Sequence, residues 1–356
     1  MVLDADAGYG GQDGPGWLAK MKGYLWLISP KNMLAAATGA GATYLLYKTL
    51  LAAINSPRYS KEPVSLAREW RDGGADSGEL RRHLSFLDPN LDDYTKNMVL
   101  HNITRSVYLL ESEASACTYE NLKMVASFLD DKENAIKVQA LNALKAFSGI
   151  RKFKIKIQEW VPKILELVTS IWDPELHIAG LRLLNGLPLP DHTLSLLRKH
   201  IPSLIKIAQS GNTLAQVQAL KFLSTLAQKE YLLYDILNCQ VRDVLKLFDT
   251  SQPGNLLYES LSFVEQLSEG RLTRQYHSMS WEFNELSLHE ALFGKESHLA
   301  DCLLSLLMHR EEEVQMQACK VILSLQLYKE EMEEATISTH PMESSAFSDD
   351  GIQYNM

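Results

Sequence analysis

The chain has 356 residues, of which 46% are hydrophobic and 22% are charged, a balance typical of a protein with a substantial buried core. Its formal net charge of −9 repels phosphate backbones, so the composition argues against nucleic-acid binding. The four cysteines are far apart and form no CxxC pair, which argues against structural zinc or a disulfide framework and fits a reducing compartment.

Residues 1–32 are expected to form a flexible N-terminal segment. Residues 1–16 are rich in glycine and acidic residues and contain no arginine. A matrix-targeting presequence would be basic and amphipathic, and a secretory signal would begin with a basic region, so neither is predicted here.

Residues 33–54 are apolar, and Lys48 is the only charged residue among them. As a helix, these 22 residues would be about 33 Å long, against a hydrocarbon thickness of ~30 Å. The sequence therefore predicts a single membrane-anchor helix in which Lys48 extends to the lipid headgroups. The residues that characterise this predicted anchor are Gly39, Gly41, Tyr44, Leu45, Leu46, Tyr47 and Lys48.

This stretch has two other interpretations. A glycine-rich phosphate loop is disfavoured because Tyr44 stands at the third glycine position and no strand precedes it. A capping helix packed on the first repeat, in a soluble nuclear or chromatin-associated adaptor, is the alternative. Small residues at four-residue spacing, such as Ala37 and Gly41, either face lipid or let two such helices pair, which would give self-association.

Prolines, paired glycines and mixed charges predict a linker over residues 55–78. From 79 to 328, apolar residues recur at three- and four-residue spacing and strand signals are missing. Five similar segments follow one another at a spacing near 40 residues, with a longer gap before the last. They are VQALNALKAF from Val138, IAGLRLLNGL from Ile178, VQALKFLSTL from Val217, YESLSFVEQL from Tyr258 and MQACKVILSL from Met316.

Each copy follows a polar break and an earlier amphipathic helix. A period of about 40 residues is typical of armadillo or HEAT solenoids. A small residue stands at the third position of each copy and would let neighbouring helices approach closely; these are Ala140, Gly180, Ala219, Ser260 and Ala318. We therefore expect an all-α, armadillo-like, right-handed superhelical solenoid of about five to six repeats. The acidic, serine-rich residues 329–356 predict a disordered tail.

The extra residues before the last copy, Glu269–Lys295, have two interpretations. They form either a loop on the binding face or a cap in which Trp281, Phe283 and Phe293 cover the end of the core. The chain contains no HExxH, no GxSxG and no cysteine in a known nucleophile sequence, so we expect neither an enzyme nor a cofactor.

Two sets of polar residues are candidates for partner binding. Helical register predicts a partner-binding groove lined by Asn142, Lys145, Arg182, Asn185 and Lys221. A basic run predicts a patch for an acidic partner or anionic lipid headgroups, formed by Arg151, Lys152, Lys154 and Lys156. The alternative for this run is one solvated helix face with Ile155 and Ile157 turned inward.

The segment GAGATYLLYK, Gly39–Lys48, together with LNALKAF, KIKI, HIAGLRLL and VQALKFLSTLAQ, resembles the mitochondrial armadillo-repeat-containing proteins over residues 34–328. This resemblance implies a non-enzymatic adaptor on the mitochondrial outer membrane, with its solenoid in the cytosol. Such proteins bind outer-membrane and cytosolic or cytoskeletal proteins, and they influence mitochondrial clustering, adherence and positioning.

Peptide-carrying armadillo proteins, such as nuclear import adaptors, bear ladders of tryptophan and asparagine on the equivalent helices. In this sequence the tryptophan places are occupied by Asn142, Arg182 and Lys221, and the asparagine places by Ala146, Gly186 and Thr225. The comparison therefore disfavours nuclear-import cargo binding.

Overall fold

The computed structural model describes residues 78–279, 281 and 284–339, and these residues form helices joined by short turns. The isolated antiparallel bridge found among them joins Gln240 to Ser287. In chain order the α-helices are α4 (Glu79–Phe86), α5 (Asp93–Leu109), α6 (Glu111–Ala116), α7 (Tyr119–Ser127), α8 (Asn134–Phe147), α9 (Arg151–Lys156), α10 (Val161–Ser170), α11 (Pro174–Asn185), α12 (Leu194–Ala208), α13 (Thr213–Ala227), α14 (Glu230–Leu237), α15 (Gly254–Arg271), α16 (Arg274–Ser278), α17 (Leu288–Phe293), α18 (Leu299–Leu306) and α19 (Glu312–Thr339). Short 3-10 helices are η2 (Phe128–Asp130), η3 (Ile157–Trp160), η4 (Asp191–Thr193) and η5 (Val244–Phe248).

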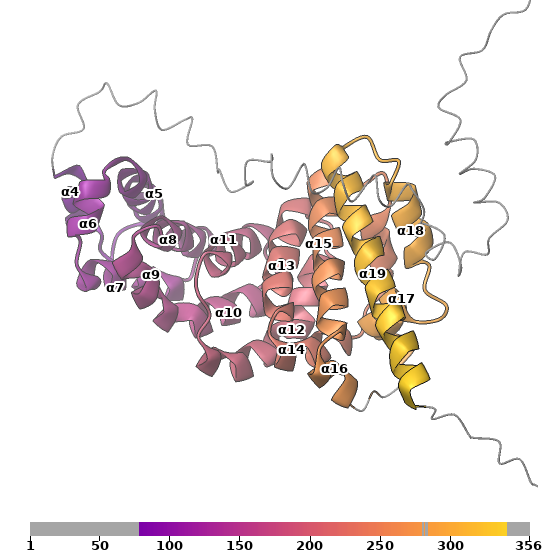
Figure 1. Cartoon of the computed structure of the whole chain (residues 1–356). Helices are drawn as coiled ribbons and strands as arrows, with labels where there is room; N and C mark the ends of the chain where they lie inside the picture. The colour runs from indigo at the N-terminus through magenta and orange to yellow at the C-terminus, as the bar shows by residue number, and fades with distance from the viewer. Residues whose placement is uncertain (1–77, 280, 282–283, 340–356) are drawn as a thin grey trace, which may run out of the picture.

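The helices stack as repeats along one direction (Figure 1). An inner row is formed by α5, α8, α11, α13, α15 and α19, and each of these helices packs against the next. Each inner helix also packs against an outer element that precedes it, as α10 does with α11 and α18 with α19. The predicted all-helical repeat architecture is therefore confirmed, and the described residues contain six inner helices.

The polar breaks between the helices act as helix caps. The Asp173 carboxylate accepts hydrogen bonds from the backbone N–H groups of Glu175 and Leu176, and Pro174 begins α11. The Asn212 side chain accepts from the Ala215 N–H in the same way at the start of α13. Because the first N–H groups of a helix have no partner within it, these side chains fix where α11 and α13 begin.

The small residues of the repeat lie where helices approach closely. Ala140, Ala219 and Ala318 are fully buried. At Gly180 an added Cβ would lie 2.3 Å from Cγ2 of Val168, which belongs to α10. The close contact between α10 and α11 therefore depends on the missing side chain.

The structure adds a third, short helix to several repeats that sequence periodicity had divided into two helices. Examples are α6 and α9, of six residues each, which lie between one inner helix and the next outer one. So short a segment contains fewer than two helical turns, and apolar periodicity cannot be recognised over that length.

The residues between the fourth and fifth copies form α16 and α17, which pack against α14, α15, η5 and α18; we call these two short helices the C-terminal cap. Trp281 and Phe293 are partly buried against the core. Phe283 lies outside the described residues.

The last helix is longer than expected, because α19 ends at Thr339 while we had placed the end of the repeat domain at residue 328. The sequence just beyond Tyr328 is rich in Lys, Glu, Met and Ala, which favour helix once a preceding turn has formed. The acidic composition predicts disorder from residue 329, but it does not take into account that α19 is already formed before this segment. The remainder of the predicted tail, residues 340–356, lies outside the described residues.

The predicted N-terminal segment, the anchor at residues 33–54 and almost all of the linker lie outside the described residues as well. This includes the anchor residues Gly39, Gly41, Tyr44, Leu45, Leu46, Tyr47 and Lys48. Within the described part of the chain, none of the helices has the length and apolar character needed to span a membrane.

Candidate protein-binding face

The five residues of the predicted groove lie on three successive inner helices. Asn142 and Lys145 belong to α8, Arg182 and Asn185 to α11, and Lys221 to α13. Arg182 and Lys221 are exposed, and the other three are partly exposed. We call this side of the row, continued over α15 and α19, the ladder face.

Polar contacts connect the inner helices along the ladder face. The Asn185 Nδ2 group donates to the backbone oxygen of Gln218 at 3.0 Å and to its side-chain oxygen at 3.1 Å. Lys145 reaches the end of the next helix, since a Cβ on Gly186 would lie 2.6 Å from its Nζ atom. The structure therefore places the predicted residues on three successive helices that pack against one another, and it gives two of them contacts with the following repeat.

Lys221 forms an ion pair with a residue that sequence reasoning missed. Its Nζ atom lies 3.4 Å from Oε1 of Glu259 on α15, where the glutamate side chain is 16% exposed and the lysine 46%. Burial raises the pKa of Glu259 above its ordinary value, and the Lys221 cation opposes that rise. This pair joins α13 to α15 on the ladder face.

A second missed carboxylate, Glu265, lies one and a half turns further along α15. It accepts a hydrogen bond from the side-chain amide of Gln317 on α19, and burial raises its pKa despite that bond and the nearby Lys320 cation. The repeat alignment contained a signal, because the fourth copy has glutamate where the other copies have neutral or basic residues.

The four basic side chains of the predicted patch on α9 differ in their contacts and exposure. Lys152 donates to the backbone oxygens of Ser115 and Cys117, the latter at 3.0 Å, and Lys156 lies over the Tyr119 ring. Arg151 is exposed and Lys154 partly buried. Two of the four cations therefore already contact protein groups.

The alternative interpretation of this run, a solvated helix face with Ile155 and Ile157 turned inward, is wrong for Ile155. Ile157 is buried, but Ile155 is 60% exposed. Residues two apart in a helix point in nearly opposite directions, so these two isoleucines cannot both face the core. The buried partner of Ile157 is Phe153, four residues earlier.

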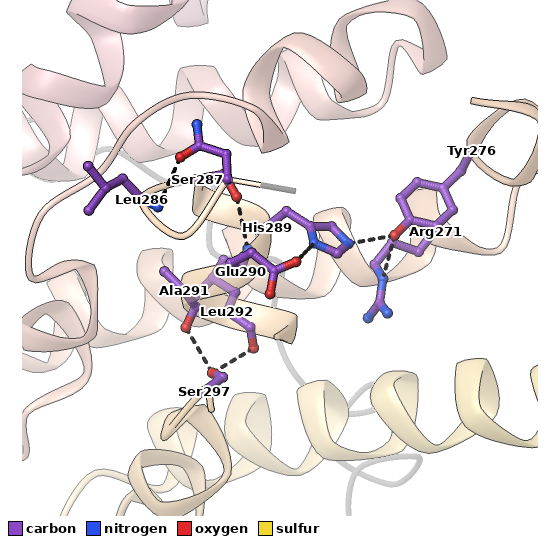
Figure 2. A network of polar contacts seen from close by, with 10 residues as sticks. Arg271, Tyr276, Leu286, Ser287, His289, Glu290, Ala291, Leu292 and Ser297 are labelled. Carbon is purple, nitrogen blue, oxygen red and sulfur yellow. Dashed lines mark hydrogen bonds and ion pairs between the residues drawn. The ribbon is translucent and has the colours of Figure 1, made fainter. Parts of the chain in front are cut away.

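A buried polar network supports the cap at the C-terminal end (Figure 2). The Arg271 Nε atom donates to the Tyr276 hydroxyl at 3.4 Å, which lies 2.7 Å from Nε2 of His289. The Arg271 guanidinium also lies 3.7 Å from the ring centroid of Tyr328 and 4.2 Å from that of Phe293. These contacts hold α15, α16, α17 and α19 together at one point.

Away from the ladder face, a shallow surface pocket of about 310 Å³ opens among α12, α14 and α16. Its lining includes Arg198, whose Nε atom lies 2.7 Å from Oδ2 of Asp235. No group of His, Cys, Asp and Glu side chains suited to a metal ion occurs in the described part of the chain.

Comparisons with known proteins agree with this architecture. The Armadillo-like family model matches residues 77–292. The mouse protein named Armadillo repeat-containing protein 12 is 60% identical over 302 residues, covering 83% of this chain and 89% of the relative. The human protein of the same name is 57% identical over 320 residues, covering 88% of this chain and 94% of the relative.

Among solved structures, an engineered protein aligns with a TM-score of 0.55 at 15% identity, covering 70% of this chain and 99% of its own. A designed armadillo repeat protein in complex with the peptide (KR)4 aligns with a TM-score of 0.51 at 15% identity, covering 69% of this chain and 99% of its own. At this identity the likeness shows the fold alone.

Armadillo repeats form a scaffold that is generally non-enzymatic and suited to protein binding, and the names of the two relatives carry no enzyme function. With a family match over more than half of its length and two relatives aligned over most of theirs, the chain belongs to the armadillo-like family, together with the proteins named Armadillo repeat-containing protein 12.

Proposed function

We propose that this protein is a non-enzymatic adaptor of the mitochondrial outer membrane. Residues 33–54 anchor it, the solenoid faces the cytosol, and the ladder face binds partner proteins so that mitochondria cluster, adhere or are positioned. The observation that carries the proposal is the ladder face itself, where Asn142, Arg182 and Lys221 of three consecutive inner helices remain at least partly exposed. Armadillo repeats bind peptides or proteins generally, and the apolar segment supports a membrane tether.

The tether is tested by replacing Leu45 and Leu46 with arginine in the full chain. An arginine at the centre of a membrane span costs ~2.5–3.5 kcal/mol on the translocon scale, so the double variant should leave the membrane fraction. A matched control carries Leu214→Arg and Leu327→Arg, two leucines of the solenoid that are 50% and 55% exposed. The control adds the same charge outside the anchor and should stay in the membrane pellet after alkaline extraction.

Orientation is tested by protease treatment of intact mitochondria from cells that express the chain with a C-terminal tag. The expected result is loss of the tag while a matrix protein survives. Protection of the tag would place the solenoid inside the organelle and refute an outer-surface adaptor. If the protein does not pellet with mitochondria and is found in the nucleus, the soluble nuclear adaptor replaces this proposal.

The clustering role is tested by microscopy of cells that express the wild-type chain or the Leu45→Arg, Leu46→Arg variant. Wild type should gather mitochondria, and the variant should leave them dispersed at equal expression. Clustering by both chains would show that the tether is not needed and would contradict the proposal.

A further inference from the structure

Charge is divided along the ladder-face helices. The helices α8, α11 and α13 together contain four cations and one carboxylate. In contrast, α15 and the part of α19 up to Tyr328 contain five carboxylates and two cations. The inner row therefore changes from net positive to net negative between α13 and α15.

The acidic half is a cluster rather than a set of separate side chains. Burial raises the pKa of Tyr258, and the nearby charges of Glu259, Glu265 and Glu313 raise it further. The tyrosine is 38% exposed and stands at the surface of this cluster. Lys221 and Lys320 flank the carboxylates without matching their number.

Glu259 and Glu265 are partly buried, and their polar partners in the structure are Lys221 and Gln317. Burial is the largest influence on both Glu259 and Glu265, and it raises the pKa of each even though each has a polar partner. A carboxylate that is partly withdrawn from water gains more from a further cation than one that is fully hydrated. A basic group from a partner would supply that cation.

The basic half, formed by α8, α11 and α13, has cations without an acidic partner among the described residues. Lys145 and Arg182 make no ion pair with any residue that the structure describes, while Lys221 is engaged by Glu259 at the boundary. Arg182 is exposed and its guanidinium can hold a carboxylate with two parallel hydrogen bonds.

Resting on the protein-binding role proposed above, we propose that the ladder face binds an extended segment of a partner protein whose charges are segregated. Acidic residues of the segment lie over α8 and α11, and its basic residues lie over α15. A nucleic acid and an anionic membrane are negatively charged throughout, so the acidic half of the ladder face would repel either of them.

The spacing of the inner helices sets the length of the segment. Packed helices are about 8–10 Å apart, so the two and a half steps from the midpoint of α8 and α11 to α15 span roughly 20–25 Å. An extended chain advances about 3.3 Å per residue, so the acidic and basic groups of the segment are centred about six to eight residues apart.

The test measures binding of labelled peptides to the detergent-solubilised full chain by fluorescence anisotropy. One probe peptide has three glutamates, a four-residue Gly/Ser spacer and three arginines. The second has the same composition with glutamate and arginine alternating. The segregated peptide should bind about tenfold more tightly than the alternating one, a difference equivalent to about 1.4 kcal/mol.

Two variants locate the binding. Arg182→Glu should weaken binding of the segregated peptide at least fivefold and leave the alternating peptide almost unchanged. Lys199→Glu makes the same charge change at an exposed position on α12, away from the ladder face, and should alter neither affinity by more than a factor of two. Equal effects of the two variants would attribute binding to overall charge and overturn the proposal.

A second readout separates this proposal from the proposed function. A photo-crosslinking amino acid is placed at Asn142 or, as a control, at Lys199 in the full chain in cells. A partner protein captured at Asn142 alone, combined with equal affinity for the two peptides or binding of neither, would refute charge segregation and retain the protein-binding role. A crosslinked product of twice the chain mass would identify a second copy as the occupant and refute a partner segment.

Discussion

Replacing Arg271 with alanine should loosen the C-terminal cap while leaving the first repeats unchanged. The side chain is 8% exposed, and its guanidinium lies over the rings of Tyr328 and Phe293 while donating to Tyr276. Each desolvated cation–π contact is worth roughly 0.5–2 kcal/mol, and the hydrogen bond contributes about 1 kcal/mol. The relief of a buried charge offsets part of this sum. We expect a net local cost of about 2–3 kcal/mol.

Hydrogen–deuterium exchange of the full chain measures this loss of stability separately for each part of the chain. Exchange governed by local opening should accelerate about 30- to 150-fold in peptides from α17 and α19, and peptides from α8 should keep wild-type rates. Locality is expected because each repeat of a solenoid contacts only its neighbours. Arg274→Ala, an exposed arginine at the start of α16, is the matched control and should change neither region.

Arg271→Met separates the charge from the packing. Methionine keeps much of the apolar volume but has no cation, so it should recover less than half of the lost protection. If Arg271→Met exchanged like the wild type, packing alone would hold the cap and the cation–π argument would be refuted. Uniform acceleration along the whole chain would refute the local coupling.

Two further predictions concern packing and pH. Gly180→Ala should lower the unfolding temperature, because overpacking against Val168 costs roughly 1–3 kcal/mol. The control Gly211→Ala should be neutral or slightly stabilising, because no atom lies within 4 Å of its added Cβ. Equal effects of the two variants in a thermal melt would contradict the close-packing account. Burial lowers the pKa of His289 below its unfolded value of about 6.5, so its contribution to stability is present above that pH and is lost as the pH falls toward the folded pKa. The unfolding temperature should therefore decrease between pH 7.5 and 5.5, and His289→Asn should reduce the decrease; an unchanged slope in the variant would exclude this histidine as a source.

The repeat architecture was predictable because similar segments recur at regular spacing along the sequence. A period near 40 residues and a small residue at a fixed place in each copy both reflect contacts between neighbouring helices, and Gly180 shows how direct that link is. The short helices α6 and α9 left no comparable pattern, and the length of α19 depends on a helix already formed before Tyr328. These features depend on context that composition does not contain.

The placement of the candidate residues on successive helices was also predictable, but their contacts with neighbouring repeats were not. Helical register placed Asn185 and Lys221 on one face, because register requires only the geometry of a single helix. Their partners Gln218 and Glu259 come from the following repeats, so the contacts depend on how one helix packs on the next. The same limit explains Ile155, whose exposure follows from the short helix in which it lies.

The two halves of the ladder face also differ in how firmly they are built. Of the five buried side-chain polar atoms without a hydrogen-bond partner among the described residues, three are the hydroxyls of Ser260, Ser268 and Ser324 on α15 and α19. A buried polar group left unsatisfied costs about 1–3 kcal/mol, so the last repeats have a smaller margin of stability than the first. Because coupling in a solenoid is local, opening on mild heating should begin at this end.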